Sequence, residues 1–175
     1  AGKLKMPSED LSADMFEMTQ DLTASYGLPA YEISNHARPG QESRHNLIYW
    51  RYGEYAGIGP GAHGRLIMGG ARHATAAEKM PFKWWEKVIE TGDGLVTDDT
   101  LTWDEEGDEY LVMGLRLREG IDPARYQALA RRALTATQID FLKSIGFIET
   151  LPNGRLRVTD KGWPVLDAVV ADLAA

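Results

Sequence analysis

The sequence predicts an α+β fold, in which the end of a parallel sheet or of a partial (β/α) barrel is followed by a winged-helix-like C-terminal domain. The first observation is a helix, a tight turn and a strand over residues 8–34, an order that repeats in parallel sheets and barrels. The second is the pattern of residues 101–175, where three helices precede a hairpin and a last helix. The polar, turn-rich stretch GDGLVTDDT, residues 92–100, separates the two parts. We therefore expect an incomplete parallel sheet or barrel in residues 1–75, a connecting helix and linker in residues 76–100, and the winged-helix-like domain after them.

The first helix is bounded by residues that commonly begin and end helices. Ser8 is its predicted N-cap, two acidic residues follow in the first turn, and Gly27 ends it. A short strand over residues 30–34 comes next. Because no element precedes this helix, we expect the barrel part to be a fragment of a longer one. The exposed edge of its strand would then allow a dimer.

The next region is predicted to contain little regular structure. Residues 35–55 show no periodicity, and a segment of that length without an element of its own is often functional. A strand is possible in AGIG, residues 56–59. Gly69-Gly70 between RLIM and ARHA predicts a hairpin turn. The sequence PFKWWEKVIET, residues 81–91, predicts a helix with one apolar side.

The C-terminal part carries several helix start signals. Capping boxes are predicted at Thr102 with Glu105 and at Thr135 with Gln138, and Asp122 before a proline predicts another helix start. A hairpin turns near Asn153-Gly154, and a last helix is expected from Thr159-Asp160. In DNA-binding winged helices the helix before the hairpin enters the major groove. Here that helix offers one positive charge, Lys143, and the chain has a net charge of −7, so we expect no nucleic-acid binding.

Composition excludes several other classes of protein. Of the 175 residues, 43% are hydrophobic and 26% are charged, as in soluble globular proteins. No apolar run approaches the roughly 18 residues that a membrane span requires, so no transmembrane segment is expected. The chain has no Cys, which removes disulfides and Cys-ligated iron–sulfur clusters from these residues. A cytoplasmic location is favoured.

The segment SRHNLIYWRYGEYAGIGPGAHG, residues 43–64, is the strongest candidate site. The imidazole of His45 is a possible metal ligand, and Tyr49 and Trp50 could form a flat apolar wall for a planar macrocycle. Carboxylates of such a ligand could bind nearby arginines, namely Arg38, Arg44 and Arg51. The alternative is a surface loop that Tyr49 and Trp50 anchor in a core, with His45 making an ordinary hydrogen bond. No catalytic triad or carboxylate pair is predicted, so no catalytic residue is assigned.

The stretches YEISNHARPG, HNLIYW and GIGPGAHG, in this order, resemble the oxygen-independent coproporphyrinogen III oxidase family of radical SAM proteins. The resemblance is closest to the haem-chaperone branch, HemW, and covers essentially the whole chain. EYLVMGLRLREGID, residues 109–122, resembles the opening of the family's C-terminal domain. The resemblance implies a radical SAM barrel, and in the full-length protein S-adenosylmethionine and a [4Fe–4S] cluster whose CxxxCxxC ligands this chain lacks.

The family's HNxxYW pattern is met by four residues, His45, Asn46, Tyr49 and Trp50. In the haem-chaperone branch this pattern is associated with haem binding, which implies that His45 is the iron ligand. Tyr31 and Ile33 match a family strand that passes the adenine of S-adenosylmethionine, and they are the expected cofactor contacts. The implied partners are porphyrin or haem and haem-accepting proteins.

Three functions remain open from the sequence. The first is a haem-binding chaperone, and the second is a true coproporphyrinogen III oxidase, which converts two propionate groups to vinyl groups. The third is a winged-helix module that binds nucleic acid. The HNxxYW pattern favours the first. The fragment alone is expected to be inactive in radical chemistry, which depends on the cluster.

Overall fold

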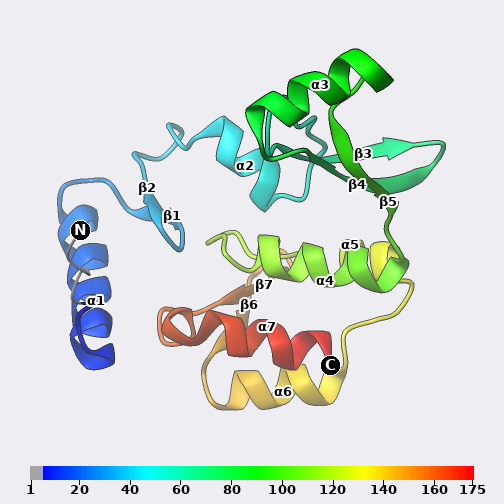
Figure 1. Cartoon of the computed structure of the whole chain (residues 1–175). Coiled ribbons are helices and arrows are strands. Elements are labelled where there is room, and N and C mark those ends of the chain that lie inside the picture. Colours follow the sequence, from blue (N-terminus) through cyan, green and yellow to red (C-terminus); the bar gives the residue numbers. More distant parts are fainter. Residues whose placement is uncertain (1–5) are drawn as a thin grey trace.

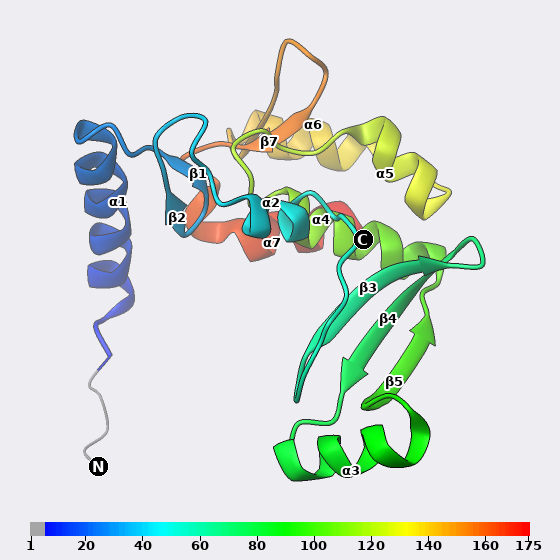
Figure 2. The ribbon, with the colours of Figure 1, turned by 90° about the horizontal axis from the view of Figure 1, so that it is seen from above.

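The computed structural model describes residues 6–175, which form three antiparallel sheets with helices around them. In Figures 1 and 2, α1 stands apart at one end and the β3–β4–β5 sheet with α3 lies at another. The helices α4 to α7 and the β6–β7 hairpin pack together, and α2 lies between β1–β2 and the larger sheet. The chain therefore places its unusual aromatic segment at a junction.

Helix α1, Glu9–Ser25, begins as predicted. The Ser8 side chain accepts a hydrogen bond from the Leu11 amide at 3.3 Å, and Gly27 follows the helix with φ of +73°. Phe16 lies edge-on to Trp163, with ring centroids 6.4 Å apart. Apolar side chains that recur every three or four residues along α1 are exposed, at Leu11, Met15, Met18 and Leu22.

The strand predicted at residues 30–34 is shorter, and its pairing differs from that of a barrel strand. Strand β1, Ala30–Glu32, forms an antiparallel hairpin with β2, Asn35–His36. The Glu32 carboxylate accepts hydrogen bonds from the Ser34 amide and hydroxyl, and these bonds turn the chain. The other side of β1 pairs with residues 116–118, through an antiparallel bridge between Glu32 and Leu117. The edge that was expected to be free for a dimer is therefore occupied.

The prediction that residues 35–55 contain no helix or strand is wrong. Besides β2, they form helix α2, Arg44–Trp50, whose start is capped by the Ser43 side chain at 3.3 Å from the Asn46 amide. Seven residues make two turns, too few for a hydrophobic period to be visible in the sequence. The strand expected at 56–59 is also absent from the structure, which has only an isolated bridge there between Tyr55 and Arg65.

Residues 63–100 form one β-β-α-β unit. Strands β3, His63–Met68, and β4, Ala71–Ala77, turn at Gly69-Gly70 as predicted, and both glycines have positive φ. Helix α3, Pro81–Thr91, also matches its prediction. The stretch expected to be a linker contains β5, Leu95–Thr100, which pairs with β4. Its charged residues fit a strand at the edge of a sheet, where one side faces solvent.

The remaining elements follow the predicted order. They are α4, Trp103–Gly114; α5, Pro123–Ala130; α6, Ala136–Ser144; β6, Ile148–Thr150; β7, Leu156–Val158; the 3₁₀ helix η1, Trp163–Val165; and α7, Leu166–Ala174. The capping box at Thr102 and the Asp122 cap are confirmed. Thr135 makes no side-chain capping bond, and the last helix begins after the expected Thr159, whose hydroxyl instead donates to the Gly146 carbonyl at 2.7 Å. The winged-helix class stays a prediction.

The hydrophobic core lies mainly in this C-terminal part. Its most buried side chains come from α4 to α7, η1, the β6–β7 hairpin and the segment between α4 and α5, and include Leu111, Leu115, Ile121, Tyr126, Leu142, Val158, Trp163, Val169 and Leu173. Leu117 is also buried, at 2% exposed, where it pairs with β1. The best-packed part of the chain therefore reaches the strand beside α2.

We predict that Leu117→Ala lowers the free energy of unfolding by about 2–5 kcal/mol, because it leaves a cavity where residues 116–118 meet β1. Urea denaturation followed by circular dichroism measures the change. The control is Val112→Ala on α4, where the side chain is 48% exposed and the loss is expected to be below about 0.5 kcal/mol. Equal losses in the two variants would contradict the prediction.

Candidate functional site

Helix α2 presents two of its four pattern residues on its outer face. His45 and Tyr49 are one turn apart, and His45 Nε2 lies 3.1 Å from the Tyr49 hydroxyl oxygen. Their rings meet edge-on, with centroids 4.8 Å apart and an angle of 86° between planes. The Tyr49 ring also packs against Tyr55 at 4.3 Å. His45 is exposed and Tyr49 half-buried, so this face carries two possible iron ligands beside each other.

The other two pattern residues lie on the inner face of α2. Asn46 Nδ2 lies 3.4 Å from the Tyr31 hydroxyl oxygen, and the Arg116 guanidinium stacks over the Trp50 ring at 4.5 Å. The flat wall expected from Tyr49 and Trp50 together is therefore not formed. Adjacent helical residues point about 100° apart, whereas residues four apart share a face. Asn46 and Trp50 anchor the helix that carries the outer pair.

A buried carboxylate supports the inner anchor. Glu32 is 0% exposed; one of its oxygens accepts bonds from Ser34 and Asn35, and the other lies 3.5 Å from Arg116 Nη2. Arg116 thus connects Glu32 to Trp50. No local pattern in the sequence marks Arg116. The signal was an acidic residue between apolar neighbours on the predicted strand, which requires a buried cation elsewhere.

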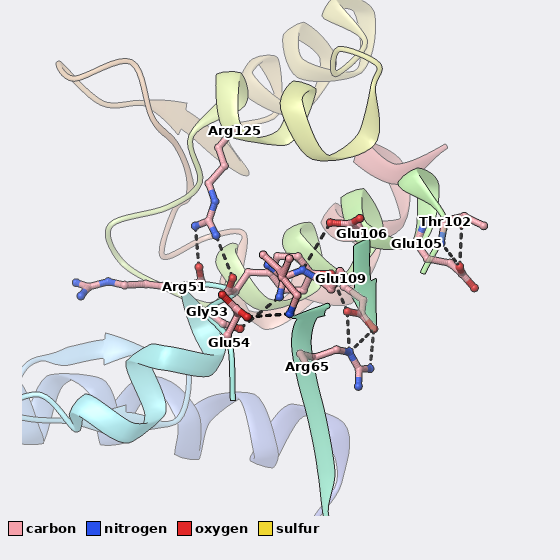
Figure 3. A network of polar contacts seen from close by, with 12 residues as sticks. Arg51, Gly53, Glu54, Arg65, Thr102, Glu105, Glu106, Glu109 and Arg125 are labelled. Atoms are coloured by element: carbon pink, nitrogen blue, oxygen red, sulfur yellow. Dashed lines mark hydrogen bonds and ion pairs between the residues drawn. The ribbon is translucent and has the colours of Figure 1, made fainter. Parts of the chain in front are cut away.

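The C-terminal end of α2 is held by Arg125 of α5 (Figure 3) and by Glu119 in the segment between α4 and α5. Arg125 of α5 donates to the backbone carbonyls of Arg51 and Tyr52, at 2.7 and 3.0 Å. The Arg51 guanidinium binds Glu119 with two hydrogen bonds of 2.9 and 2.7 Å. These contacts fix the turn in which Tyr52 adopts a positive φ of 52°. Of the three arginines expected to bind ligand carboxylates, Arg51 is already paired within the chain.

Two carboxylates of α4 hold the buried Tyr52 ring and the β3–β4–β5 sheet together (Figure 3). The Tyr52 hydroxyl donates to Glu109 at 2.9 Å, and Arg65 of β3 forks onto the same carboxylate at 2.7 and 3.0 Å. Arg72 of β4 stacks on the Tyr52 ring at 4.1 Å and lies 3.5 Å from Glu106. Burial raises the pKa of Tyr52, and the Glu109 charge raises it further, so the phenol stays a proton donor.

The remaining histidines lie elsewhere. His36 contacts the Gln20 side chain at 3.2 Å, His73 pairs with Asp98 at 2.8 Å across β4 and β5, and His63 begins β3. Neither of these two contacts involves α2.

The expected cofactor contacts, Tyr31 and Ile33, use part of their backbone within the chain. The Tyr31 carbonyl accepts from the Arg118 amide at 3.0 Å, and the Ile33 amide donates to the Arg116 carbonyl at 3.1 Å. These two groups are therefore not available to an adenine. The assignment of Tyr31 and Ile33 to S-adenosylmethionine stays a prediction.

Comparisons with known proteins find a matching domain family and similar sequences. The HemN C-terminal domain family matches residues 101–165. The haem chaperone HemW of Lactococcus lactis is 32% identical over 93% of this chain, and HemW of Bacillus subtilis is 32% identical over 82%. The chain is a HemW/HemN-like sequence. The mitochondrial radical S-adenosyl methionine domain-containing protein 1 of Danio rerio is 35% identical over 97% of the chain.

The fold of this HemW/HemN-like chain matches that of a solved radical SAM enzyme. Coproporphyrinogen III oxidase, HemN, from Escherichia coli superposes with a TM-score of 0.68 over 97% of the chain, at 17% identity. The chain spans 40–42% of the length of the Danio rerio and Lactococcus lactis relatives and 42% of the HemN chain. Within residues 6–175, no helix combines the length and apolar character needed to cross a bilayer.

We predict that Arg116→Met lowers the free energy of unfolding by about 3 kcal/mol, because it leaves the buried Glu32 carboxylate without its cation. Adding Glu32→Gln to this variant should restore part of the loss. Urea denaturation measures both. The control is Arg157→Met, which breaks the more exposed 2.8 Å pair with Glu149 and should cost less than about 1 kcal/mol. Strict additivity of the two Arg116 and Glu32 changes would contradict the proposed coupling.

A pH dependence follows from Glu119. The hydrogen bonds from Arg51 hold the pKa of Glu119 below its ordinary value of 4.5, so this pair stabilises the fold above pH 4.5 and loses its effect as the pH falls through the folded-state pKa. The two side chains are 53% and 38% exposed, so solvent screening keeps the contribution below about 1 kcal/mol. Wild type should exceed Glu119→Gln in unfolding free energy at neutral pH. If the difference in unfolding free energy between wild type and Glu119→Gln persisted in strong acid, the pH dependence could not come from Glu119.

Proposed function

We propose that this chain is part of a HemW-like haem chaperone and that it binds haem on the outer face of α2. The observation that carries the proposal is the pair of donor side chains, the exposed His45 and the half-buried Tyr49, held 3.1 Å apart on a helix that is anchored along its inner face and at its C-terminal end. Histidine and tyrosine are both known protein ligands of haem iron. The HNxxYW pattern favours His45 as the iron ligand.

The surroundings of the donor pair fit a porphyrin. Ile48 lies one turn from His45 and is 44% exposed, which adds apolar surface for the macrocycle. Arg44 precedes His45 and is exposed, as is Arg38, so cations for propionate groups lie in the same segment. Asn46 and Trp50 serve as the inner anchors that keep this face in place. Two HemW relatives at 32% identity support the chaperone reading.

The second candidate is the oxidase reaction, which the fold match to Escherichia coli HemN favours. That match, at 17% identity, concerns the fold alone. A [4Fe–4S] cluster does not fit the residues of this chain, because they include no Cys. S-adenosylmethionine and the cluster are therefore proposals for a whole protein of the relatives' length. Transfer of haem to haem-accepting proteins is likewise proposed for the whole protein.

A haem titration tests the proposed site. The Soret absorption of haemin should shift when haemin is added to the purified chain. The His45→Ala/Tyr49→Phe double variant should bind haemin more than about tenfold more weakly, a loss of about 1.4 kcal/mol or more in binding free energy. The control is His73→Ala, which removes a histidine of the β3–β4–β5 sheet that pairs with Asp98. If the double variant kept the wild-type affinity, α2 would not be the haem site.

A further inference from the structure

We propose that Tyr49 ligates ferric haem through its phenol oxygen, with His45 accepting the phenol proton. His45 takes the iron itself only after reduction. This inference rests on the proposed haem-binding function and names the ligand atom for each oxidation state. It differs from the expectation that the imidazole is the ligand throughout.

His45 Nε2 already has a contact within the chain. It lies 3.1 Å from the Tyr49 oxygen, within hydrogen-bond distance. If the ring proton is on Nδ1, the Nε2 lone pair accepts the Tyr49 proton; if it is on Nε2, that atom carries a proton and has no lone pair to offer. In either tautomer an iron ion must displace this contact before it can bind Nε2.

The Tyr49 oxygen is positioned more firmly than His45 Nε2. The Tyr49 ring is held between His45 and Tyr55, in edge-on contacts of 4.8 and 4.3 Å. Tyr55 is itself fixed, because its backbone amide and carbonyl both bond to Arg65 at 2.8 Å. The His45 side chain is exposed, so its ring is less restricted than that of the half-buried Tyr49. A ligand that is already oriented loses less entropy when it binds.

The two donors suit different oxidation states of haem iron. An anionic phenolate oxygen is a hard ligand that suits ferric iron, whereas neutral imidazole serves ferrous haem well. Two donor atoms 3.1 Å apart lie on the same side of any porphyrin that approaches this face. The iron therefore takes one of them at a time, and its oxidation state selects which one.

The steps balance in protons and electrons. When ferric haem binds, the O–H bond of Tyr49 breaks, the proton moves to His45 Nε2, and an iron–oxygen bond forms. When a one-electron reductant converts the iron to the ferrous state, the iron–oxygen bond breaks and the proton returns to Tyr49. His45 Nε2 is then neutral and unprotonated, and it binds the iron. Retention of haem thereby depends on the oxidation state of the iron.

Spectroscopy of single variants tests the ligand assignment. Ferric haem bound to the wild type should show a tyrosinate-to-iron charge-transfer band and phenolate modes in the resonance Raman spectrum. Tyr49→Phe should lose both and give an imidazole-type ferric spectrum. His45→Ala should keep both, with an affinity lower by about 10–100-fold, the usual effect of removing a partner of a metal ligand. The control, Tyr55→Phe, removes a neighbouring hydroxyl and should keep both.

Reduction with dithionite provides the second measurement. The wild type and Tyr49→Phe should then give the same imidazole-ligated ferrous spectrum, which His45→Ala should not give. A wild-type ferric spectrum of imidazole type that Tyr49→Phe leaves unchanged would overturn this inference. The proposed haem site would survive that result if the double variant still lost binding. A wild type that shows no Soret shift would overturn both proposals.

Discussion

The pairing of residues 116–118 with β1 is the contact on which the arrangement of the chain depends. Leu117 is buried opposite Glu32, and the backbones on either side exchange hydrogen bonds of 3.0 and 3.1 Å. The arginines that flank Leu117 each stack on a tryptophan, Arg116 on Trp50 and Arg118 on Trp163, at 4.5 and 3.6 Å. Three residues in the part that matches the HemN C-terminal domain thus hold both strand β1 and helix α2.

Helix α2 is consequently held from two directions while one face stays open. Its inner face is anchored through Trp50 and Asn46, and its C-terminal end is fixed by Arg125 and Glu119. A seven-residue helix has little stability of its own, so these tertiary contacts maintain it. The open face carries His45 and Tyr49, of which Tyr49 also packs on Tyr55. This arrangement suits the haem-binding surface that we propose.

Sequence patterns predicted most of the C-terminal part because its signals are local. The capping box at Thr102, the Asp122-Pro123 start and the hairpin near Gly154 involve neighbours in the chain. The errors fall where distant contacts decide the structure. Strand β5 was mistaken for a linker because its polarity reflects an edge position, which depends on β4. Helix α2 was missed because packing, rather than periodicity, stabilises it.

The sequence by itself determined which residues make up the candidate site, since the HNxxYW pattern names His45, Asn46, Tyr49 and Trp50. Only the tertiary structure decided which of these four side chains lie on the outer face of α2 and which lie on its inner face. A helix turns about 100° per residue, so His45 and Tyr49 face outward while Asn46 and Trp50 face β1 and Arg116. The role of Arg116 also required the fold, because its partners Glu32 and Trp50 come from segments far from it in the chain.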